Sequence, residues 1–168
     1  MSVGIPYEER GQRIDDGIGA VRALWTESPA TYHGNFYDFT KVHSDPKPAQ
    51  AGGVPILVGG STDVAARRAG RLGDGFFPHA ISPDEFANRI ETMSKAAKEA
   101  GRAPAEIELT FSPTSWKFGA SLDLGIMKAY ADLGVSRLIC VAHEAMSTDL
   151  KDIERFVKTC RDTVIARL

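Results

Sequence analysis

The sequence has little cysteine, no long apolar run and no excess of charge of one sign. Its 168 residues include two cysteines, Cys140 and Cys160, whose positions match neither a CxxC pair nor the spacing of metal ligands. A disulfide scaffold and a metal site are therefore not indicated. No stretch approaches the roughly 18 to 20 apolar residues of a membrane span, and the first residues lack the apolar core of a signal peptide. We expect a cytoplasmic protein that does not enter a membrane.

The charge balance argues against nucleic acid as a main partner. Lys and Arg number 20 against 22 Asp and Glu, which gives a formal net charge of −2 at pH 7. Proteins that bind along a phosphate backbone carry a basic excess. With 43% hydrophobic residues, the chain has enough apolar content for the core of one ordinary domain, which we expect to span residues 1–168.

Apolar spacing predicts helices that alternate with short buried strands. Ser82-Pro83-Asp84-Glu85 is a capping-box sequence with proline at the first helical position, and Gly101 suits a left-handed helix end. The expected helices lie at about residues 7–25, 61–73, 82–100, 122–133 and 147–164, and the expected strands at 54–60, 74–80, 107–111 and 136–142. Residues 26–53 form a long excursion, in which we expect one short extended segment at Phe36–Phe39.

Alternating strands and helices predict a parallel sheet with right-handed crossovers. The spacing between successive units suits an open doubly wound sheet and part of a barrel equally well. The fold class is therefore α/β, and periodicity alone leaves the choice between these two architectures open.

The segment Val58-Gly59-Gly60-Ser61-Thr62 lies at an expected strand-to-helix junction. Two glycines let a ligand approach the backbone closely, and the free amides of the next helical turn attract a phosphate. The alternative is a tight turn in which Ser61 or Thr62 caps the helix. This alternative has weight, because a lone glycine pair is neither a GxGxxG nor a Walker motif, and Asp63 would partly repel an anion.

Aromatic residues follow at the end of the next expected strand. Phe76 or Phe77 could face a planar ring, and His79 lies just beyond them. The alternative is that both phenylalanines belong to the core and that His79 is an ordinary loop residue.

Other polar residues are weaker candidates. His33, His43 and Lys47 lie in the long excursion and suit a loop that covers a substrate, although solvated loop residues are the simpler interpretation. His143 follows the fourth expected strand, where barrel enzymes carry their functional residues. The three arginines of the helix after the glycine turn, Arg67, Arg68 and Arg71, are expected on its solvated face. No Ser-His-Asp set or nucleophile elbow supports a hydrolase.

Several segments together resemble the luciferase-like monooxygenase superfamily. They are IPYEERGQRIDDGIGAVRALWTE, YHGNFYDF, PKPAQ, PILVGGSTDVAARRAGRLGDGFFP and SPDEFANRIETMSKAAKEAGRAPAEIEL, and their order and spacing match across nearly the whole chain. The resemblance implies a TIM barrel that uses FMN or the deazaflavin F420. It also implies that the long excursion lies near the mouth of the pocket and can cover a substrate.

The same resemblance assigns cofactor-binding residues. It implies that the backbone of Gly59, Gly60 and Ser61 lies near the cofactor phosphate and that Phe76 and Phe77 line the same pocket. No catalytic residue of the family can be transferred to a position of this sequence, and the spacing of the cysteines and histidines indicates no metal ligands.

The resemblance begins in the helix after the fourth strand of the family barrel. It therefore implies the C-terminal half of a TIM barrel, with about four strands and flanking helices. We expect an F420- or FMN-dependent oxidoreductase that is incomplete and not active alone, and that forms homo-oligomers or takes the other half from a partner chain. The alternative is a non-catalytic half-barrel that serves as a binding or assembly module and homodimerises. Open parallel edges favour such association.

Overall fold

The computed structural model describes residues 4–168, which form two compact units. The smaller unit comprises the described residues up to Pro55, and the larger unit runs from Ile56 to Leu168. The assignment of residues 1–168 to one domain stays a prediction. Among the described residues, no helix is both long enough and apolar enough to cross a membrane.

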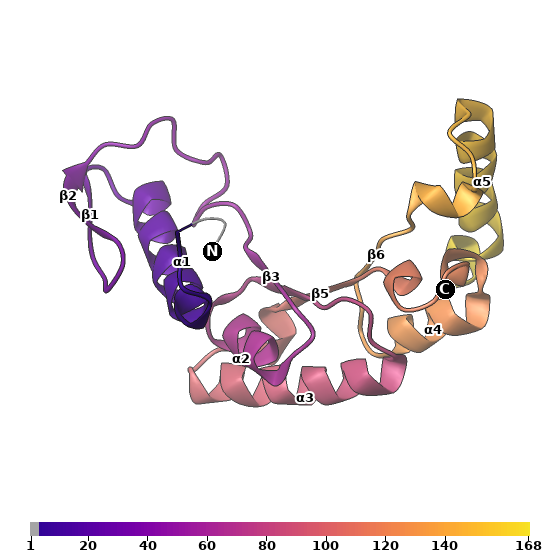
Figure 1. The fold of residues 1–168 in the computed structure, drawn as a ribbon, viewed down its shortest axis with the longest axis horizontal. Coiled ribbons are helices and arrows are strands. Elements are labelled where there is room, and N and C mark those ends of the chain that lie inside the picture. The colour runs from indigo at the N-terminus through magenta and orange to yellow at the C-terminus, as the bar shows by residue number, and fades with distance from the viewer. Residues whose placement is uncertain (1–3) are drawn as a thin grey trace. The chain divides into compact units, whose positions relative to one another are not determined.

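The smaller unit consists of a helix and a β-hairpin (Figure 1). A 3-10 helix (Tyr7–Glu9) leads into α1 (Arg10–Thr26), and β1 (Ala30–His33) pairs antiparallel with β2 (Asp38–Val42). The helix agrees with the sequence prediction, whereas the prediction of a single extended segment at Phe36–Phe39 is wrong. The structure has two strands here, and Phe36 lies in the turn between them. The amide of Gly34 closes this turn by donating a hydrogen bond to the carbonyl of Tyr37 over 2.9 Å.

Asp16 of α1 holds the turn of this hairpin. Its carboxylate accepts hydrogen bonds from the Tyr32 hydroxyl (2.7 Å) and from the amides of Phe36 (2.6 Å) and Tyr37 (3.1 Å). These donors, with the Tyr32 hydroxyl first, lower the pKa of Asp16, and the same bond raises the pKa of Tyr32. One carboxylate therefore joins the helix to a turn about 20 residues later.

The larger unit is built from four strand-and-helix repeats. In chain order its main elements are β3 (Leu57–Gly59), α2 (Asp63–Leu72), β4 (Gly75–Phe77), α3 (Pro83–Glu99), β5 (Glu108–Phe111), α4 (Leu124–Asp132), β6 (Arg137–Leu138) and α5 (Leu150–Thr163). The 3-10 helices of this unit are Pro104–Glu106, Pro113–Ser115, Ala120–Leu122, Ala142–Ala145 and Ile165–Arg167. The strands pair in parallel in the order β3-β4-β5-β6, which confirms the expected parallel sheet with flanking helices.

Local sequence signals set the ends of the helices. At the start of α3 the Ser82 hydroxyl accepts the Glu85 amide (3.2 Å), and the Glu85 carboxylate accepts the Ser82 amide (2.8 Å), so the capping box is confirmed. Gly101 after α3 and Gly134 after α4 both have positive φ, +70° and +87°. A residue without a Cβ adopts this left-handed conformation without steric cost.

Aromatic side chains fill the space between the sheet and its helices. Figure 1 shows α2, α3 and α4 on the same side of this sheet. The ring centroids of Phe86 in α3 and Phe111 in β5 are 5.3 Å apart. Phe111 also stacks on Tyr130 of α4, with ring centroids 4.3 Å apart. The buried Tyr130 hydroxyl donates to the carbonyl of Ile81 over 2.8 Å, and burial raises its pKa. The hydroxyl group that the core encloses therefore has a hydrogen-bond partner.

Helices α2 and α3 approach each other at Gly70. A Cβ on Gly70 would lie 2.9 Å from the amide nitrogen of Ala97 and would also collide with the carbonyl of Met93. Arg102 supports the end of α2 by donating to the carbonyls of Gly70 (2.8 Å) and Gly73 (2.7 Å). Small residues at this contact let the two backbones pack directly.

Some expected details of the larger unit are wrong. The fourth strand, expected over residues 136–142, is only two residues long, and the fourth helix begins at Leu124 rather than residue 122. The last helix, expected from about residue 147, begins at Leu150, which is 80% exposed, and its buried residues are Phe156 and Cys160. Arg68, expected on a solvated face, is only 8% exposed.

We expect Gly70→Ala to lower the free energy of unfolding by about 1–3 kcal/mol, because the added methyl group overpacks a contact between two backbones. Chemical denaturation checks this value. The matched control is Gly125→Ala on the exposed side of α4, where the nearest atom to a Cβ is the tip of the Asp123 side chain at 3.3 Å. Helix propensity favours alanine there, so equal destabilisation by both changes would contradict the packing argument.

The hairpin should weaken in acid through Asp16. Because its folded-state pKa lies below the ordinary value of 3.8, its contribution to stability is present above that value and is lost as the pH falls through the lowered pKa. We expect the amide NMR signals of Phe36 and Tyr37 to shift in this acid range, and the Asp16→Asn variant to lack this transition. Asp15→Asn, on the same helix, should retain it, and an unchanged titration in Asp16→Asn would refute the assignment.

Candidate functional site

The glycine turn that follows β3 requires glycine at one position. Gly60 has φ +115°, and a Cβ there would lie 3.0 Å from the Cβ of Ala65 in the next helix. Both Gly59 and Gly60 are exposed, and a Cβ on Gly59 would make only an ordinary contact with the carbonyl of Phe77, at 3.7 Å. The backbone of the turn is therefore open to a ligand, and any side chain at Gly60 would be strained.

Helix α2 begins directly after this turn. Thr62 is its N-cap, because the Thr62 hydroxyl accepts the amide of Ala65 over 3.3 Å. The cap expected at Ser61 or Thr62 is therefore at Thr62. The amides of Asp63 and Val64 also belong to the first turn, where no intrahelical acceptor is available. Such amides carry partial positive charge and favour an anion beside them.

Arg89 of α3 lies against this helix start. Its Nε donates to the carbonyl of Ser61 over 2.8 Å, and its Nη1 pairs with the Asp63 carboxylate at 2.6 Å. The repulsion that Asp63 would exert on an anion is therefore offset within the chain. Sequence reasoning missed Arg89, since nothing in its local sequence shows a contact with a residue 28 positions earlier.

The Ser61 hydroxyl is engaged by the loop after β4. It donates to the carbonyl of His79 and accepts the amide of His79 over 3.0 Å. The next residue, Ala80, donates its amide to the Ser115 hydroxyl (3.0 Å), which belongs to the segment after β5. Loops that follow three neighbouring parallel strands are thus joined at the carboxyl edge of the sheet, and both the Ser61 side chain and the His79 backbone serve this connection.

The two candidate phenylalanines lie on opposite faces of the sheet. Phe76 is opposite Val58 and Leu109 in the strand register, is 0% exposed, and contacts Phe86 with ring centroids 6.0 Å apart. Because successive side chains of a strand alternate, Phe77 points to the face away from the helices. It pairs with Gly59 and is half-buried. Of the two rings, only Phe77 shares a face with the glycine turn.

The face of the sheet away from the helices carries a polar cluster. Arg137 of β6 pairs with the Glu108 carboxylate at 3.1 Å, and the Thr110 hydroxyl donates to the same carboxylate over 2.8 Å. Thr110 and Arg137 are neighbours in the strand register. In a closed barrel such a face forms the interior.

Most of the remaining sequence candidates have structural partners. In the smaller unit His33 binds Asp38 over 2.8 Å, and the Lys47 ammonium donates to the carbonyls of Leu24 (2.8 Å) and Glu27 (2.6 Å) at the end of α1. Their role in covering a substrate stays a prediction.

The other two histidine candidates also lie against neighbouring side chains. His43 lies 3.4 Å from the Ser28 hydroxyl in the smaller unit, and His143 in the larger unit lies against Phe118, with ring centroids 5.5 Å apart. Within residues 4–168 no three His, Cys, Asp or Glu side chains are grouped as metal ligands.

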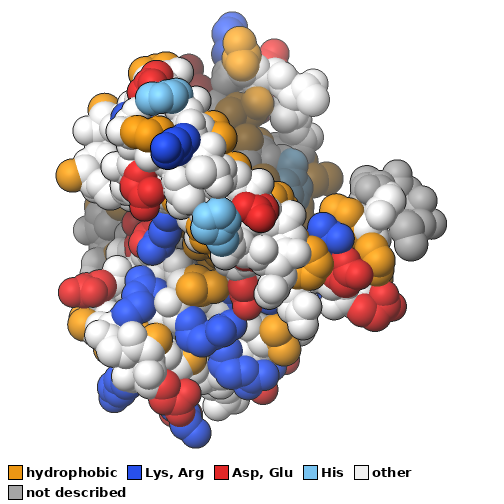
Figure 2. Space-filling model, turned by 90° about the vertical axis from the view of Figure 1, so that its left-hand side faces the viewer, with side chains coloured by type: hydrophobic (Ala, Val, Ile, Leu, Met, Phe, Trp, Pro, Cys, Tyr) orange, Lys and Arg blue, Asp and Glu red, His pale blue; other side chains and the backbone are white. Residues whose placement is uncertain are grey.

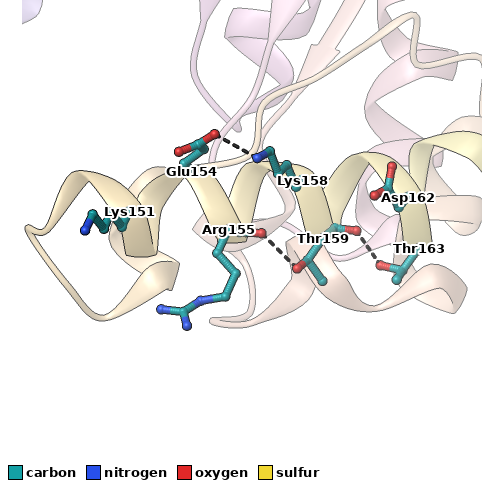
Figure 3. Close-up of a pocket in the computed structure, with 7 residues that line it drawn as sticks. All are labelled: Lys151, Glu154, Arg155, Lys158, Thr159, Asp162 and Thr163. Carbon is teal, nitrogen blue, oxygen red and sulfur yellow. Dashed lines mark hydrogen bonds and ion pairs between the residues drawn. The ribbon is translucent and has the colours of Figure 1, made fainter.

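A surface hollow beside α5 does not form a site (Figure 3). It is lined by residues of that helix alone: Lys151, Glu154, Arg155, Lys158, Thr159, Asp162 and Thr163. Glu154 and Lys158 pair over 2.8 Å, and the Thr159 hydroxyl donates a hydrogen bond to the carbonyl of Arg155.

Figure 2 shows acidic and basic side chains lying among each other on the face in view, so the visible charge is mixed.

Three relatives place the sequence among known proteins. An uncharacterised protein of Mycobacterium tuberculosis is 33% identical over 169 residues, which cover 99% of this chain and 56% of the relative. An F420-dependent glucose-6-phosphate dehydrogenase of Segniliparus rotundus is 30% identical over 66% of this chain and 35% of its own length. An FMNH(2)-dependent dimethylsulfone monooxygenase of Pseudomonas putida is 29% identical over 59% of this chain and 27% of its own length. This chain spans about half, or less, of the relatives that it matches.

Solved structures show the same fold. An F420-dependent secondary alcohol dehydrogenase in complex with an F420-acetone adduct matches 98% of this chain and 56% of its own, with a TM-score of 0.59 and 16% identity. The monooxygenase RslO1 of Streptomyces bottropensis matches 94% of this chain and 52% of its own, with a TM-score of 0.54 and 22% identity. These neighbours are TIM-barrel folds matched over about half their length, so the larger unit has the parallel architecture of part of such a barrel.

The family described as luciferase-like monooxygenase matches residues 1–115, which include the long excursion, the glycine turn and both phenylalanines. This match agrees with the resemblance seen in the sequence. The chain belongs to the luciferase-like monooxygenase family.

Proposed function

We propose that this chain holds the phosphate of F420 or FMN in an oxidoreductase of the luciferase-like family that acts on a small molecule in the cytoplasm. The observation that carries the proposal is the exposed Gly59-Gly60 turn at the start of α2, where Arg89 offsets the charge of Asp63. Both cofactors carry a phosphate, and relatives of the chain are named for dependence on one or the other.

The proposed site uses backbone groups more than side chains. The amides of Gly60, Ser61 and the first turn of α2 would contact the phosphate, and the Ser61 side chain would keep the turn in place through His79. The absence of a Cβ at Gly59 and Gly60 fits a group that must approach the backbone. When bound, the cofactor supplies hydride or oxygen chemistry, while the protein binds and orients it.

Phe77 rather than Phe76 is the better candidate to contact the cofactor. Phe77 is half-buried on the face that it shares with Gly59, whereas Phe76 is enclosed between the sheet and α3. We propose that Phe76 supports the site from behind, by packing β4 against Phe86.

We further propose that the chain acts within a larger assembly, in which a second copy or a partner chain covers the sheet. In the described part of the chain β3 and β6 are the outer strands of the sheet, so each has a neighbour on one side only. Open parallel edges favour association. A half-barrel that only assembles, without cofactor, is the competing proposal.

Cofactor binding should depend on Gly60. We expect the fluorescence of F420 or FMN to change saturably when the chain is added, and Gly60→Val to raise the Kd by about tenfold or more, equal to about 1.4 kcal/mol. A β-branched side chain at φ +115° would distort the turn and fill the space beside the amides. The absence of a saturable change with either cofactor would remove the binding proposal.

The control for backbone strain is Gly101→Val. Gly101 also has positive φ, and a Cβ there would meet no atom within 4 Å, but it lies at the far end of α3. Equal loss of affinity in both variants would show a general folding defect. Sedimentation velocity on the same samples separates assembly from binding, since Gly60→Val should leave the association of copies unchanged.

Arg89 should strengthen binding through Asp63. Removing the guanidinium in Arg89→Met leaves the Asp63 carboxylate uncompensated beside the anion, and we expect the Kd to rise by roughly 3- to 10-fold at low salt. Adding Asp63→Asn to this variant should restore most of the affinity. Titrations of both variants by cofactor fluorescence check this, and the effect should shrink at high ionic strength. If the double variant binds as weakly as Arg89→Met, Arg89 does not act by offsetting Asp63.

A further inference from the structure

Ala80, in the loop between β4 and α3, has a backbone conformation that residues with a side chain rarely adopt. Its φ is +54°, although the residue is not glycine. A Cβ makes this left-handed conformation unfavourable, so the surrounding structure has to hold it. Residues in such conformations are concentrated at functional sites. This one lies at the carboxyl edge of the sheet, the same edge that carries the glycine turn.

Two serines from the neighbouring loops bind the backbone of this stretch. The Ser115 hydroxyl, which follows β5, accepts the Ala80 amide over 3.0 Å. One residue earlier, the Ser61 hydroxyl accepts the His79 amide over 3.0 Å and donates to the His79 carbonyl. Ser61 directly follows Gly60. A path of hydrogen bonds therefore runs from the segment after β5 to the glycine turn, through two successive residues of the loop after β4.

Both ends of this loop are anchored independently of the two serines. Pro78 and Ile81 are buried, and the Tyr130 hydroxyl donates to the carbonyl of Ile81 over 2.8 Å. The residues between these anchors, His79 and Ala80, are exposed. The conformational freedom of the loop is thus concentrated in the two residues whose amides the serines bind.

We propose that Ser115 is a positioning residue of the glycine turn. By holding Ala80 in the left-handed conformation, it keeps the His79 backbone where Ser61 binds it, and it thereby raises the affinity of the turn for the cofactor phosphate. This proposal rests on the proposed function, since it concerns the same phosphate site. A turn that is fixed before binding needs less ordering when the anion arrives. The segment after β5 then contributes to binding without supplying a group to the phosphate site.

The first test uses the full chain without cofactor. In Ser115→Ala we expect the amide NMR signals of His79 and Gly60 to shift, because the strained loop is released. The matched control is Ser112→Ala, which removes another serine hydroxyl after β5, whose hydrogen bond goes to the carbonyl of Ile139 over 3.1 Å. This control should leave both signals in place. An unchanged Gly60 signal in Ser115→Ala would overturn the proposal, whether or not the chain binds a cofactor.

The second test measures the Kd of F420 and of FMN by cofactor fluorescence. We expect Ser115→Ala to raise the Kd by about 3- to 10-fold, the loss of one hydrogen bond, and Ser112→Ala to leave it unchanged. Adding Ala80→Gly to Ser115→Ala should restore most of the affinity, because glycine adopts positive φ without steric cost. Equal loss in Ser112→Ala, or no recovery with Ala80→Gly, would show that Ser115 does not act through this strained residue.

A measurement on the original chain does not depend on any variant. Because coupling between two sites is reciprocal, a bound cofactor should slow the exchange of the Ala80 amide with solvent. If exchange is unchanged at saturation, the path does not couple the loop to the site. If neither cofactor binds, the proposed function fails together with the effect on affinity, whereas a shifted Gly60 signal in Ser115→Ala still supports the positioning of the turn. If both chains bind equally well, the proposed function stands and the role of Ser115 is refuted.

Discussion

The helix layer of the larger unit depends on a contact between backbones, where Gly70 of α2 lies against the Met93 carbonyl and the Ala97 amide of α3. No other residue type fits there without moving one of the helices. Close packing of this kind leaves little freedom in the relative position of the two elements. The positions of β3 and β4, which precede these helices, are set with them, since Val58 and Phe76 pack into the core that the helices cover.

The geometry of the glycine turn follows from this packing. Arg89 reaches both the Ser61 carbonyl and the Asp63 carboxylate because α3 lies along α2. Ser61 in turn binds the backbone of His79, so the turn is held from two neighbouring elements. A helix start whose acidic residue is paired and whose preceding loop is anchored is a preorganised place for an anion, because less order has to be imposed on binding.

Sequence reasoning succeeded where the signal was local. The capping box at Ser82, the glycine ends of α3 and α4, and the alternation of strands and helices all depend on residues within one or two turns. The turn of the hairpin is closed by a local bond between Gly34 and Tyr37, but it is also held by Asp16, a residue about 20 positions earlier that no local pattern connects to it. The same limit applies to the site: the glycine turn is a local motif, whereas the contacts of Arg89 with Ser61 and Asp63 exist only after folding.

The polar cluster on the other face of the sheet bears on what can cover it. A buried carboxylate without a partner costs several kcal/mol in order of magnitude, which would demand a matching cation from any covering chain. Here Glu108 already binds Arg137 and Thr110 of its own sheet. The charge is offset inside the chain, so a covering surface need not supply a counter-charge and can pack through neutral side chains. The requirement on a partner is then one of shape and of hydrogen bonds to the outer strands β3 and β6, which matches the way a parallel barrel closes.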